Sequence, residues 1–140
     1  MATSLICKGT VTRVSSVLNR DVKQFGKHHM FDCNEETCWN SDQGDLQWVL
    51  LDFPGPVKIS TVNVQFQGGF AGKTCRLEGS LKDEAFANLT VFYPEDNNNV
   101  QSFPIGETPS VQRLKIVFEN STDFFGRIIV YSLDVLGERA

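Results

Sequence analysis

Hydrophobic and polar residues alternate with a period of two along much of this chain. Such alternation predicts β-strands with one buried and one solvent-exposed face, because successive side chains of a strand point to opposite sides. We predict strands over 47–53, 58–67, 76–81, 111–119 and 127–137. The residues expected to face the core of the protein are Val49, Leu51, Phe53, Val62, Val64, Phe66, Leu77, Leu81, Leu114, Ile116, Phe118, Ile129, Tyr131, Leu133 and Val135.

Turn-forming residues separate these alternating runs. The breaks are Pro54-Gly55-Pro56, Gly68-Gly69 and the segments 94–99 and 106–109, whose residue types favour turns. No stretch carries a convincing helical stripe, so the chain is predicted to be all-β, folded as an antiparallel sandwich or barrel. The polar segment Asn19–Met30 lacks alternation and is predicted to be a long surface loop, which is a common place for function on a rigid sandwich.

The length of 140 residues is typical of one domain. No linker, internal repeat or change of composition marks a boundary, so we predict a single domain spanning residues 1–140. Apolar residues make up 41% and charged residues 21% of the chain, which excludes a disordered protein.

The sequence has no apolar run that approaches the roughly 20 residues of a membrane span. Its N-terminus also lacks the apolar core of a secretory signal. We therefore expect an intracellular protein that is neither secreted nor bound to membranes. Reduced thiols are expected in that compartment at Cys7, Cys33, Cys38 and Cys75.

The net charge of −4 argues against direct nucleic-acid binding, but the charge is uneven. Residues 1–30 hold five basic side chains against Asp21 alone; they are Lys8, Arg13, Arg20, Lys23 and Lys27. We favour a solvated basic edge. A docking face for an acidic partner is the alternative.

Three oxygen-bearing side chains cluster at Asp32, Asn34 and Thr37. A hard cation such as Ca²⁺ binds six to eight oxygen atoms, and this segment would supply only part of that set. The same residues also form Asx turns, in which side chains bond to nearby backbone amides. From the residues alone we favour the turn.

Two other patterns suggest chemistry that we do not favour. Cys33 and Cys38 follow His28 and His29, but a second ligand pair at zinc-finger spacing is missing. The two histidines adjoin each other, and no nucleophile, phosphate-binding or metalloprotease motif accompanies them. We therefore predict that the protein is not an enzyme.

Two segments are predicted to present aromatic side chains. The glycine-rich stretch 68–73 lacks the ending of a phosphate-binding loop and is predicted to be a mobile hairpin loop with an exposed Phe70. Phe124 and Phe125 are adjacent, so both cannot face the core of one sheet. Either one of them is exposed as an anchor for a partner, or both pack at the end of the barrel.

Several motifs in order along the chain resemble the discoidin, or coagulation factor (F5/8) type C, family. These motifs are Ser15-Ser16, Asp32-x-Asn34-x-x-Thr37-x-Trp39, Gln47-Trp48-Val49-x-Leu51-Asp52-Phe53, Arg76-Leu77-Glu78-Gly79-Ser80, Arg113-Leu114-Lys115-Ile116 and Leu133-Asp134-Val135-Leu136-Gly137. The resemblance covers nearly the whole chain. It implies an eight-stranded antiparallel jelly roll of the galactose-binding-like class.

The resemblance also bears on a metal and on a disulfide. Some members hold a structural Ca²⁺ at the positions that match Asp32, Asn34 and Thr37, with a carboxylate from the C-terminal end, for which Glu138 is the candidate here. Cys33 stands where the family usually has glycine, which weakens the match. Secreted members join the two ends of the domain by a disulfide, whereas this sequence has no cysteine after Gly137. We expect no required cofactor, and a structural Ca²⁺ only as an option.

In this family ligands usually meet loops at one end of the barrel. The matching loops here are Asn19–His29, Asn40–Asp45 and Gln67–Thr74. Their side chains predicted to be exposed and to contact a partner are Arg20, Lys23, Phe25, Asn40, Asp42, Phe70 and Lys73. This basic and aromatic mixture suits a protein with acidic and apolar features. A carbohydrate-binding module is the alternative.

Four further segments, 15–20, 35–44, 92–98 and 122–127, resemble a small single-domain branch of the family that associates with an orphan nuclear receptor. That resemblance implies a protein of the nucleus and cytoplasm that represses transcription by hindering the binding of the receptor to DNA. Nothing in composition or periodicity indicates this role.

Overall fold

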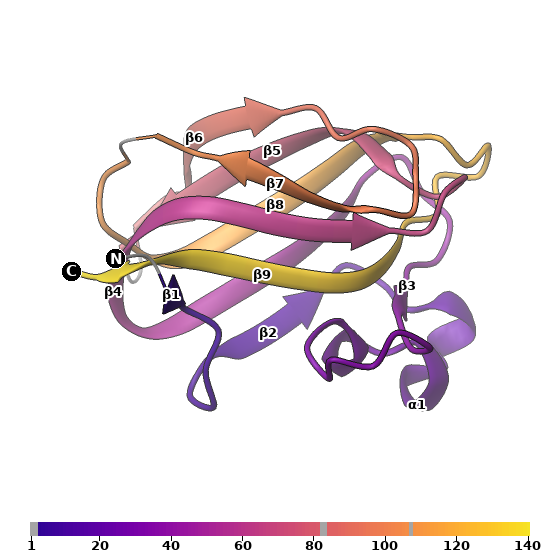
Figure 1. Cartoon of the computed structure of the whole chain (residues 1–140), viewed down its shortest axis with the longest axis horizontal. Coiled ribbons are helices and arrows are strands. Elements are labelled where there is room, and N and C mark those ends of the chain that lie inside the picture. Colours follow the sequence, from indigo (N-terminus) through magenta and orange to yellow (C-terminus); the bar gives the residue numbers. More distant parts are fainter. Residues whose placement is uncertain (1–2, 82–83, 107) are drawn as a thin grey trace.

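The computed structural model describes residues 3–81, 84–106 and 108–140. These residues form nine strands, which make a sandwich of two antiparallel sheets that share one long strand (Figure 1). The strands are β1 (Thr3–Ser4), β2 (Val11–Val14), β3 (Trp39–Asn40), β4 (Gln47–Phe66), β5 (Gly72–Ser80), β6 (Ala87–Phe92), β7 (Val100–Pro104), β8 (Val111–Ser121) and β9 (Ile129–Arg139).

Strand β4 belongs to both sheets. Its first half pairs with β2 on one side and with β8 on the other, and β5 and β6 extend this first sheet beyond β8. Its second half lies between β7 and β9, and β1 and β3 pair with β9 in the second sheet. With β4 counted as two halves, the described strands of four or more residues number eight. The predicted all-β jelly roll is therefore confirmed.

The segment Pro54-Gly55-Pro56 bends β4 but does not end it. The prediction of separate strands at 47–53 and 58–67 is wrong in this respect, because β4 runs without interruption from Gln47 to Phe66. Its pairing with β8 shifts register between Asp52 and Val57, and there the strand passes from one sheet to the other. Proline fits such a place because it has no N–H to donate to a neighbouring strand.

The core lies between the sheets and follows the predicted pattern with two exceptions. Leu81 is 38% exposed because β5 ends one residue earlier. Tyr131 is half-buried because a register shift between β4 and β9 resets the alternation, and Val130 faces inward instead. Trp39 is fully buried, and its ring centroid lies 6.1 Å from that of Phe118.

The segment 18–30 forms short helical turns instead of an irregular loop. These are the 3-10 helix η1 (Leu18–Arg20), the α-helix α1 (Val22–Phe25) and the 3-10 helix η2 (Lys27–Met30). Met30 is buried and anchors the segment to the core. We call residues 18–30 the helical segment. No helix within the described chain is long and apolar enough to cross a membrane.

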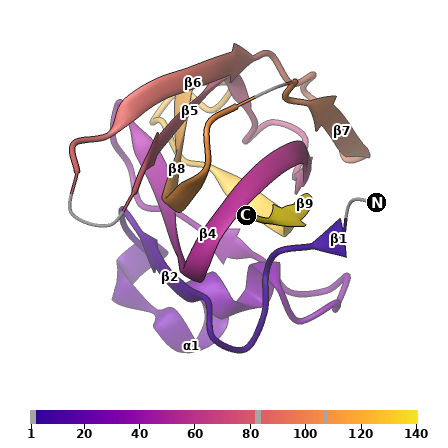
Figure 2. The same cartoon turned by 90° about the vertical axis from the view of Figure 1, so that its left-hand side faces the viewer.

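The two ends of the sandwich differ. One end holds both termini and the bend of β4, and Figure 2 views the molecule from that side. The opposite end holds the connections from β3 to β4, from β4 to β5, from β6 to β7 and from β8 to β9 (Figure 1). The helical segment lies beside this second end.

Candidate functional site

Four loops meet at the end of the sandwich opposite the termini, and together they form what we call the loop end: residues 41–46, 67–71, 93–99 and 122–128. Backbone hydrogen bonds join them. The N–H of Gly44 donates to the carbonyl of Phe125 at 3.1 Å, and the N–H of Ile129 donates to the carbonyl of Phe70 at 3.1 Å. A carboxylate oxygen of Asp96 accepts from the N–H of Gly69 at 2.8 Å. The loop end is therefore a connected surface.

Large apolar side chains are exposed on this surface. Phe124 is 93% exposed and Phe125 is 53% exposed, and their rings meet edge to face with centroids 5.2 Å apart. Leu46 and Tyr93 are also exposed in the neighbouring loops. Of the two alternatives for the phenylalanine pair, the structure supports exposure. Grouped apolar side chains of this kind mark surfaces that other molecules cover.

Arg127 holds the phenylalanine turn in place. Its Nε and Nη2 donate to the two carboxylate oxygens of Asp123 at 2.9 and 3.2 Å. The guanidinium also lies 5.2 Å from the ring centroid of Phe70 and 5.7 Å from that of Phe125. The hydrogen bonds from Arg127 lower the pKa of Asp123, and the same pairing raises the pKa of Arg127.

Most polar side chains at the loop end are already engaged within the protein. Asp123 is paired with Arg127. Asp96 accepts from Gly69 and Thr122, and Asn98 accepts from the N–H of Gly68 at 2.7 Å. The exposed apolar side chains therefore lie among polar ones, several of which are bonded within the protein.

The structure separates the residues predicted to contact a partner. Asp42 is half-buried and Lys73 is exposed, and both lie at or beside the loop end. Arg20, Lys23 and Phe25 lie on the helical segment; the first two are exposed and Phe25 is half-buried. They flank the loop end and do not belong to it.

Four of the seven residues are less exposed than predicted: Phe25, Asp42 and Phe70 are half-buried, and Asn40 is buried. Asn40 is only 8% exposed because it lies in β3, between β9 and η2, so its prediction as an exposed contact is wrong. Its Oδ1 has no hydrogen-bond partner in the described structure. Phe70 is half-buried because its ring lies against Arg127, and the 68–73 segment ends in β5 instead of forming a free hairpin loop.

The Asp32–Thr37 loop is built as a set of turns. Asp32 accepts from the N–H of Asn34 at 2.9 Å and from the hydroxyl of Thr37 at 2.5 Å. Asn34 accepts from the N–H of Glu36 at 3.0 Å. Cys33 has a φ of 57°, which explains why glycine suits this position. The Asx-turn interpretation is supported.

His29 contacts this loop through the carboxylate of Asp32. Its Nδ1 lies 3.2 Å from a carboxylate oxygen of Asp32, and its Nε2 lies 2.9 Å from the backbone carbonyl of Lys23. The Lys23 carbonyl and the Asp32 carboxylate both raise the pKa of His29. The Thr37 hydroxyl, the Asn34 amide and His29 lower the pKa of Asp32.

The proposed Ca²⁺ ligands come from two parts of the structure, the Asp32–Thr37 loop and the end of β9. Trp39 beside the loop pairs with Val130, whereas Glu138 pairs with Lys58 farther along β9. Glu138 thus lies near the end of β9, eight residues beyond the partner of Trp39. Among the described residues no group of three or more His, Cys, Asp or Glu side chains is placed to hold a metal ion.

The structure also shows features that we did not predict from the sequence. Trp48 is half-buried on the outer face of the first sheet. Arg127 was not singled out, although its spacing of four residues from Asp123 is a recognisable signal for a pair in a tight turn. The alternation of hydrophobic and polar residues does not predict that Leu46 and Tyr93 are exposed.

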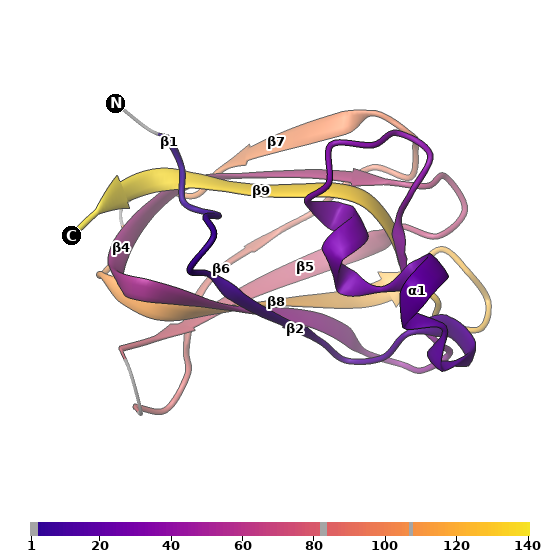
Figure 3. The same ribbon diagram turned by 90° about the horizontal axis from the view of Figure 1, so that it is seen from below.

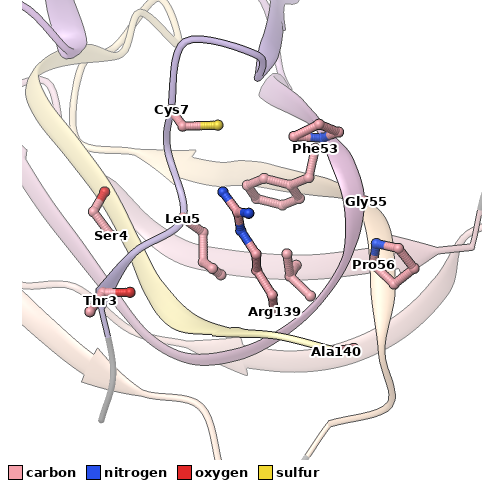
Figure 4. A pocket seen from close by; sticks show the side chains of 11 residues that line it. Thr3, Ser4, Leu5, Cys7, Phe53, Gly55, Pro56, Arg139 and Ala140 are labelled. Carbon is pink, nitrogen blue, oxygen red and sulfur yellow. The ribbon is translucent and has the colours of Figure 1, made fainter.

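A separate pocket of about 350 Å³ lies near the termini, and Figure 4 shows it from close by. Cys7, Phe53 and Arg139 line it. The Thr10 hydroxyl, 3.5 Å from the Cys7 sulfur, lowers the pKa of that thiol. All four cysteines are free in the structure.

The fold is similar to solved carbohydrate-binding and F5/8 type C domains. An F5/8 type C domain from Bacteroides fragilis has a TM-score of 0.83 at 13% identity, covering 99% of this chain and 98% of that one. A family 32 carbohydrate-binding module from C. perfringens NanJ, solved in complex with galactose, has a TM-score of 0.78 at 15% identity, covering 97% of this chain and 99% of that one. These similarities establish the fold.

Comparison of sequences gives closer relatives. No protein-family model matches the chain. The nuclear receptor 2C2-associated protein of Danio rerio is 73% identical over 139 residues, with 99% of each chain covered. The human protein of the same name is 56% identical over 139 residues, again with 99% of each chain covered. This chain therefore belongs to the family of nuclear receptor 2C2-associated proteins.

Proposed function

We propose that this protein is a non-enzymatic interaction module that associates with a nuclear receptor and hinders the binding of that receptor to DNA. The names of its relatives support the choice of partner, since identity reaches 73% and extends over 99% of both chains. The module acts in the nucleus and the cytoplasm, requires no cofactor, and does not itself contact nucleic acid or a membrane.

The exposure of Phe124 is the observation that carries this proposal. Phe124 is 93% exposed, so its side chain buries little apolar surface within its own chain. Covering such a side chain contributes roughly 1.5–3 kcal/mol to binding, and buried aromatic side chains are frequent hot spots of protein interfaces. The Asp123–Arg127 pair orders the turn in advance, which lowers the entropic cost of binding.

Binding of a carbohydrate is the second candidate, because a solved domain with this fold was obtained in complex with galactose. Sugar sites need polar groups that are free to bond hydroxyl groups. Here Asp96, Asn98 and Asp123 are engaged with other groups of the loop end. We therefore expect no chemical-shift change on addition of millimolar galactose, and a saturable change at the loop end would favour the second candidate.

The association can be tested with purified nuclear receptor 2C2. The double variant Phe124→Ser/Phe125→Ser should lose most of the binding, whereas Val11→Thr, at a residue with a similar 55% exposure on the first sheet, should keep it. Both variants should retain the melting temperature of the parent, because none of the three residues belongs to the core. Equal binding by all three proteins would refute the assignment of the loop end.

The proposed hindrance of DNA binding needs a separate measurement. Labelled receptor-site DNA is followed by fluorescence anisotropy while this protein is added to the receptor–DNA complex. We expect the DNA to be released, and we expect the Phe124→Ser/Phe125→Ser variant to leave it bound. A stable complex of this protein, the receptor and the DNA would support the association but would contradict the hindrance of DNA binding.

A further inference from the structure

A second pocket lies away from the loop end, between the helical segment and the first sheet. Its volume is about 380 Å³. Figures 1 and 3 place the helical segment beside β2 and the first half of β4. The residues that line it include Arg13, Val14 and Trp48 from the strands, and Val22, Lys27 and His28 from the helical segment.

The floor of this pocket, which we call the Trp48 pocket, is apolar. Trp48 is half-buried and Val14 lies beside it, while Val22 is 62% exposed at the opposite wall. An indole face next to aliphatic side chains forms a surface on which a bulky apolar side chain packs well. The pocket is large enough for one such side chain together with part of its backbone.

The rim of the Trp48 pocket is basic. Arg13 and Lys27 line it, no carboxylate does, and Lys115 places its Nζ 5.1 Å from the centroid of the Trp48 ring. Within the described residues neither Arg13 nor Lys27 forms an ion pair. This local positive charge contrasts with the net charge of −4 for the whole chain.

Three carboxylates on neighbouring elements are engaged elsewhere. Glu78 and Glu119, on the same sheet, both pair with Arg76, at 3.2 and 2.6 Å. Asp21 accepts from the N–H of Gln24 and caps α1. The unpaired cations at the rim therefore favour an acidic partner.

The outer wall of the pocket is held in shape by internal contacts. A Cβ atom on Gly26 would lie 2.3 Å from the carbonyl oxygen of Val22. The turn after α1 therefore has no room for a side chain at this position. His29 ties the Lys23 carbonyl to Asp32 on the adjoining loop. A wall that is already ordered loses little conformational entropy when a ligand binds.

We propose that the Trp48 pocket is a docking site for an acidic segment of a protein partner. One bulky apolar side chain of the segment packs on Trp48, and flanking carboxylates pair with Arg13, Lys27 and Lys115. The pocket thus assigns a docking role to two of the five basic residues of segment 1–30, Arg13 and Lys27. This site does not depend on the loop end, and either can operate without the other.

The probe for this proposal is a short synthetic peptide in which glutamates flank a leucine-phenylalanine pair. Titrated into the ¹⁵N-labelled protein, it should shift the indole N–H signal of Trp48 and leave that of Trp39 unchanged, because Trp39 is fully buried in the core. Peptides with alanine for the apolar pair, or with lysine for the glutamates, should bind at least about tenfold more weakly.

Two charge variants of equal net charge make the test specific to the pocket. Arg13→Glu/Lys27→Glu should weaken peptide binding by about tenfold or more, with a smaller effect at high salt. Lys8→Glu/Lys58→Glu makes the same change of charge at exposed positions outside the pocket and should bind the peptide as the parent does.

Three results with the peptide would overturn the proposal. They are equal weakening by the two charge variants, signal changes confined to the loop end, and no binding of the peptide at millimolar concentration. Preferential binding of a double-stranded DNA oligonucleotide at Trp48 would also overturn it, since the pocket would then serve a different class of partner. Loss of loop-end binding by Phe124→Ser/Phe125→Ser should leave peptide binding intact, so failures of the two proposals can be told apart.

Discussion

Gly126 and Gly44 lie so close together that a side chain on Gly126 has no room. A Cβ atom there would lie 2.0 Å from the carbonyl oxygen of Gly44, and the φ of Gly126 is +83°. This contact joins the phenylalanine turn to the loop between β3 and β4. The shape of the loop end therefore depends on glycine at a position remote from the core.

The first prediction is that Gly126→Ala destabilises the fold and displaces Phe124 and Phe125. We expect a loss of roughly 1–3 kcal/mol in the free energy of unfolding, from backbone strain and the clash together. Thermal and urea denaturation measure it. Gly69→Ala is the matched control, because Gly69 also has a positive φ of +90° but nothing within 4 Å of a Cβ atom. A larger loss for Gly69→Ala would contradict the account.

The second prediction concerns the reactivity of the thiols. Hydrogen bonding to Thr10 lowers the pKa of Cys7, whereas burial raises the pKa of Cys38 and, most strongly, of Cys75. Since the thiolate is the reactive form, iodoacetamide at neutral pH should label Cys7 before Cys38, and Cys75 only after unfolding. Peptide mass spectrometry over time measures the order. Thr10→Val should slow the labelling of Cys7, and early labelling of Cys75 would contradict the packing.

The third prediction is a pH-dependent stability of the turn at Asp32. The pKa of His29 is raised above its ordinary value near 6.5, so its contribution is fully present below that pH and is lost as the pH rises through the raised pKa. The pKa of Asp32 is lowered below 3.8, so its contribution is present above that value and is lost as the pH falls through the lowered pKa.

The two contributions are therefore present together between about pH 4 and 6.5. Melting temperatures of the parent and of His29→Gln should differ most in this window and converge at higher pH. NMR titration of the His29 ring should give a pKa above that of a free imidazole. An ordinary pKa, or a difference that grows above pH 8, would contradict the ion pair.

The fourth prediction is that Ca²⁺ does not stabilise the protein. The Asp32 carboxylate already bonds to Thr37, Asn34 and His29, so a cation would have to displace these partners. Melting temperatures in millimolar Ca²⁺ and in EDTA should agree. A rise with Ca²⁺ that Asp32→Asn abolishes would show that the loop rearranges to bind metal, as the family resemblance allowed.

The alternation of hydrophobic and polar residues correctly predicted which side chains of a single strand face the core. The alternation around Val49, Val62 and Ile116 placed these residues in the core correctly because the period of a strand depends only on its own sequence. The continuity of β4 through Pro54 and Pro56 could not be predicted in this way, since it results from pairing with two different sheets.

The candidate site was predictable in part. The adjacent Phe124 and Phe125 could not both face one core, which left exposure as one of two alternatives. The burial of Asn40 and the half-burial of Phe70 depend on neighbours distant in sequence, namely β9 and Arg127. The Trp48 pocket likewise requires residues from β2, β4 and the helical segment to meet, and no local pattern contains that information.

The measurement that tests the central claim most directly is chemical-shift mapping of the ¹⁵N-labelled protein with unlabelled nuclear receptor 2C2. We predict that amide signals of residues 41–46, 67–71 and 122–128 change or broaden on addition of the receptor, and that the Phe124→Ser/Phe125→Ser variant shows no such change. Changes centred on the end that carries the termini, or a saturated complex with no change at the loop end, would contradict the claim that this surface binds the receptor.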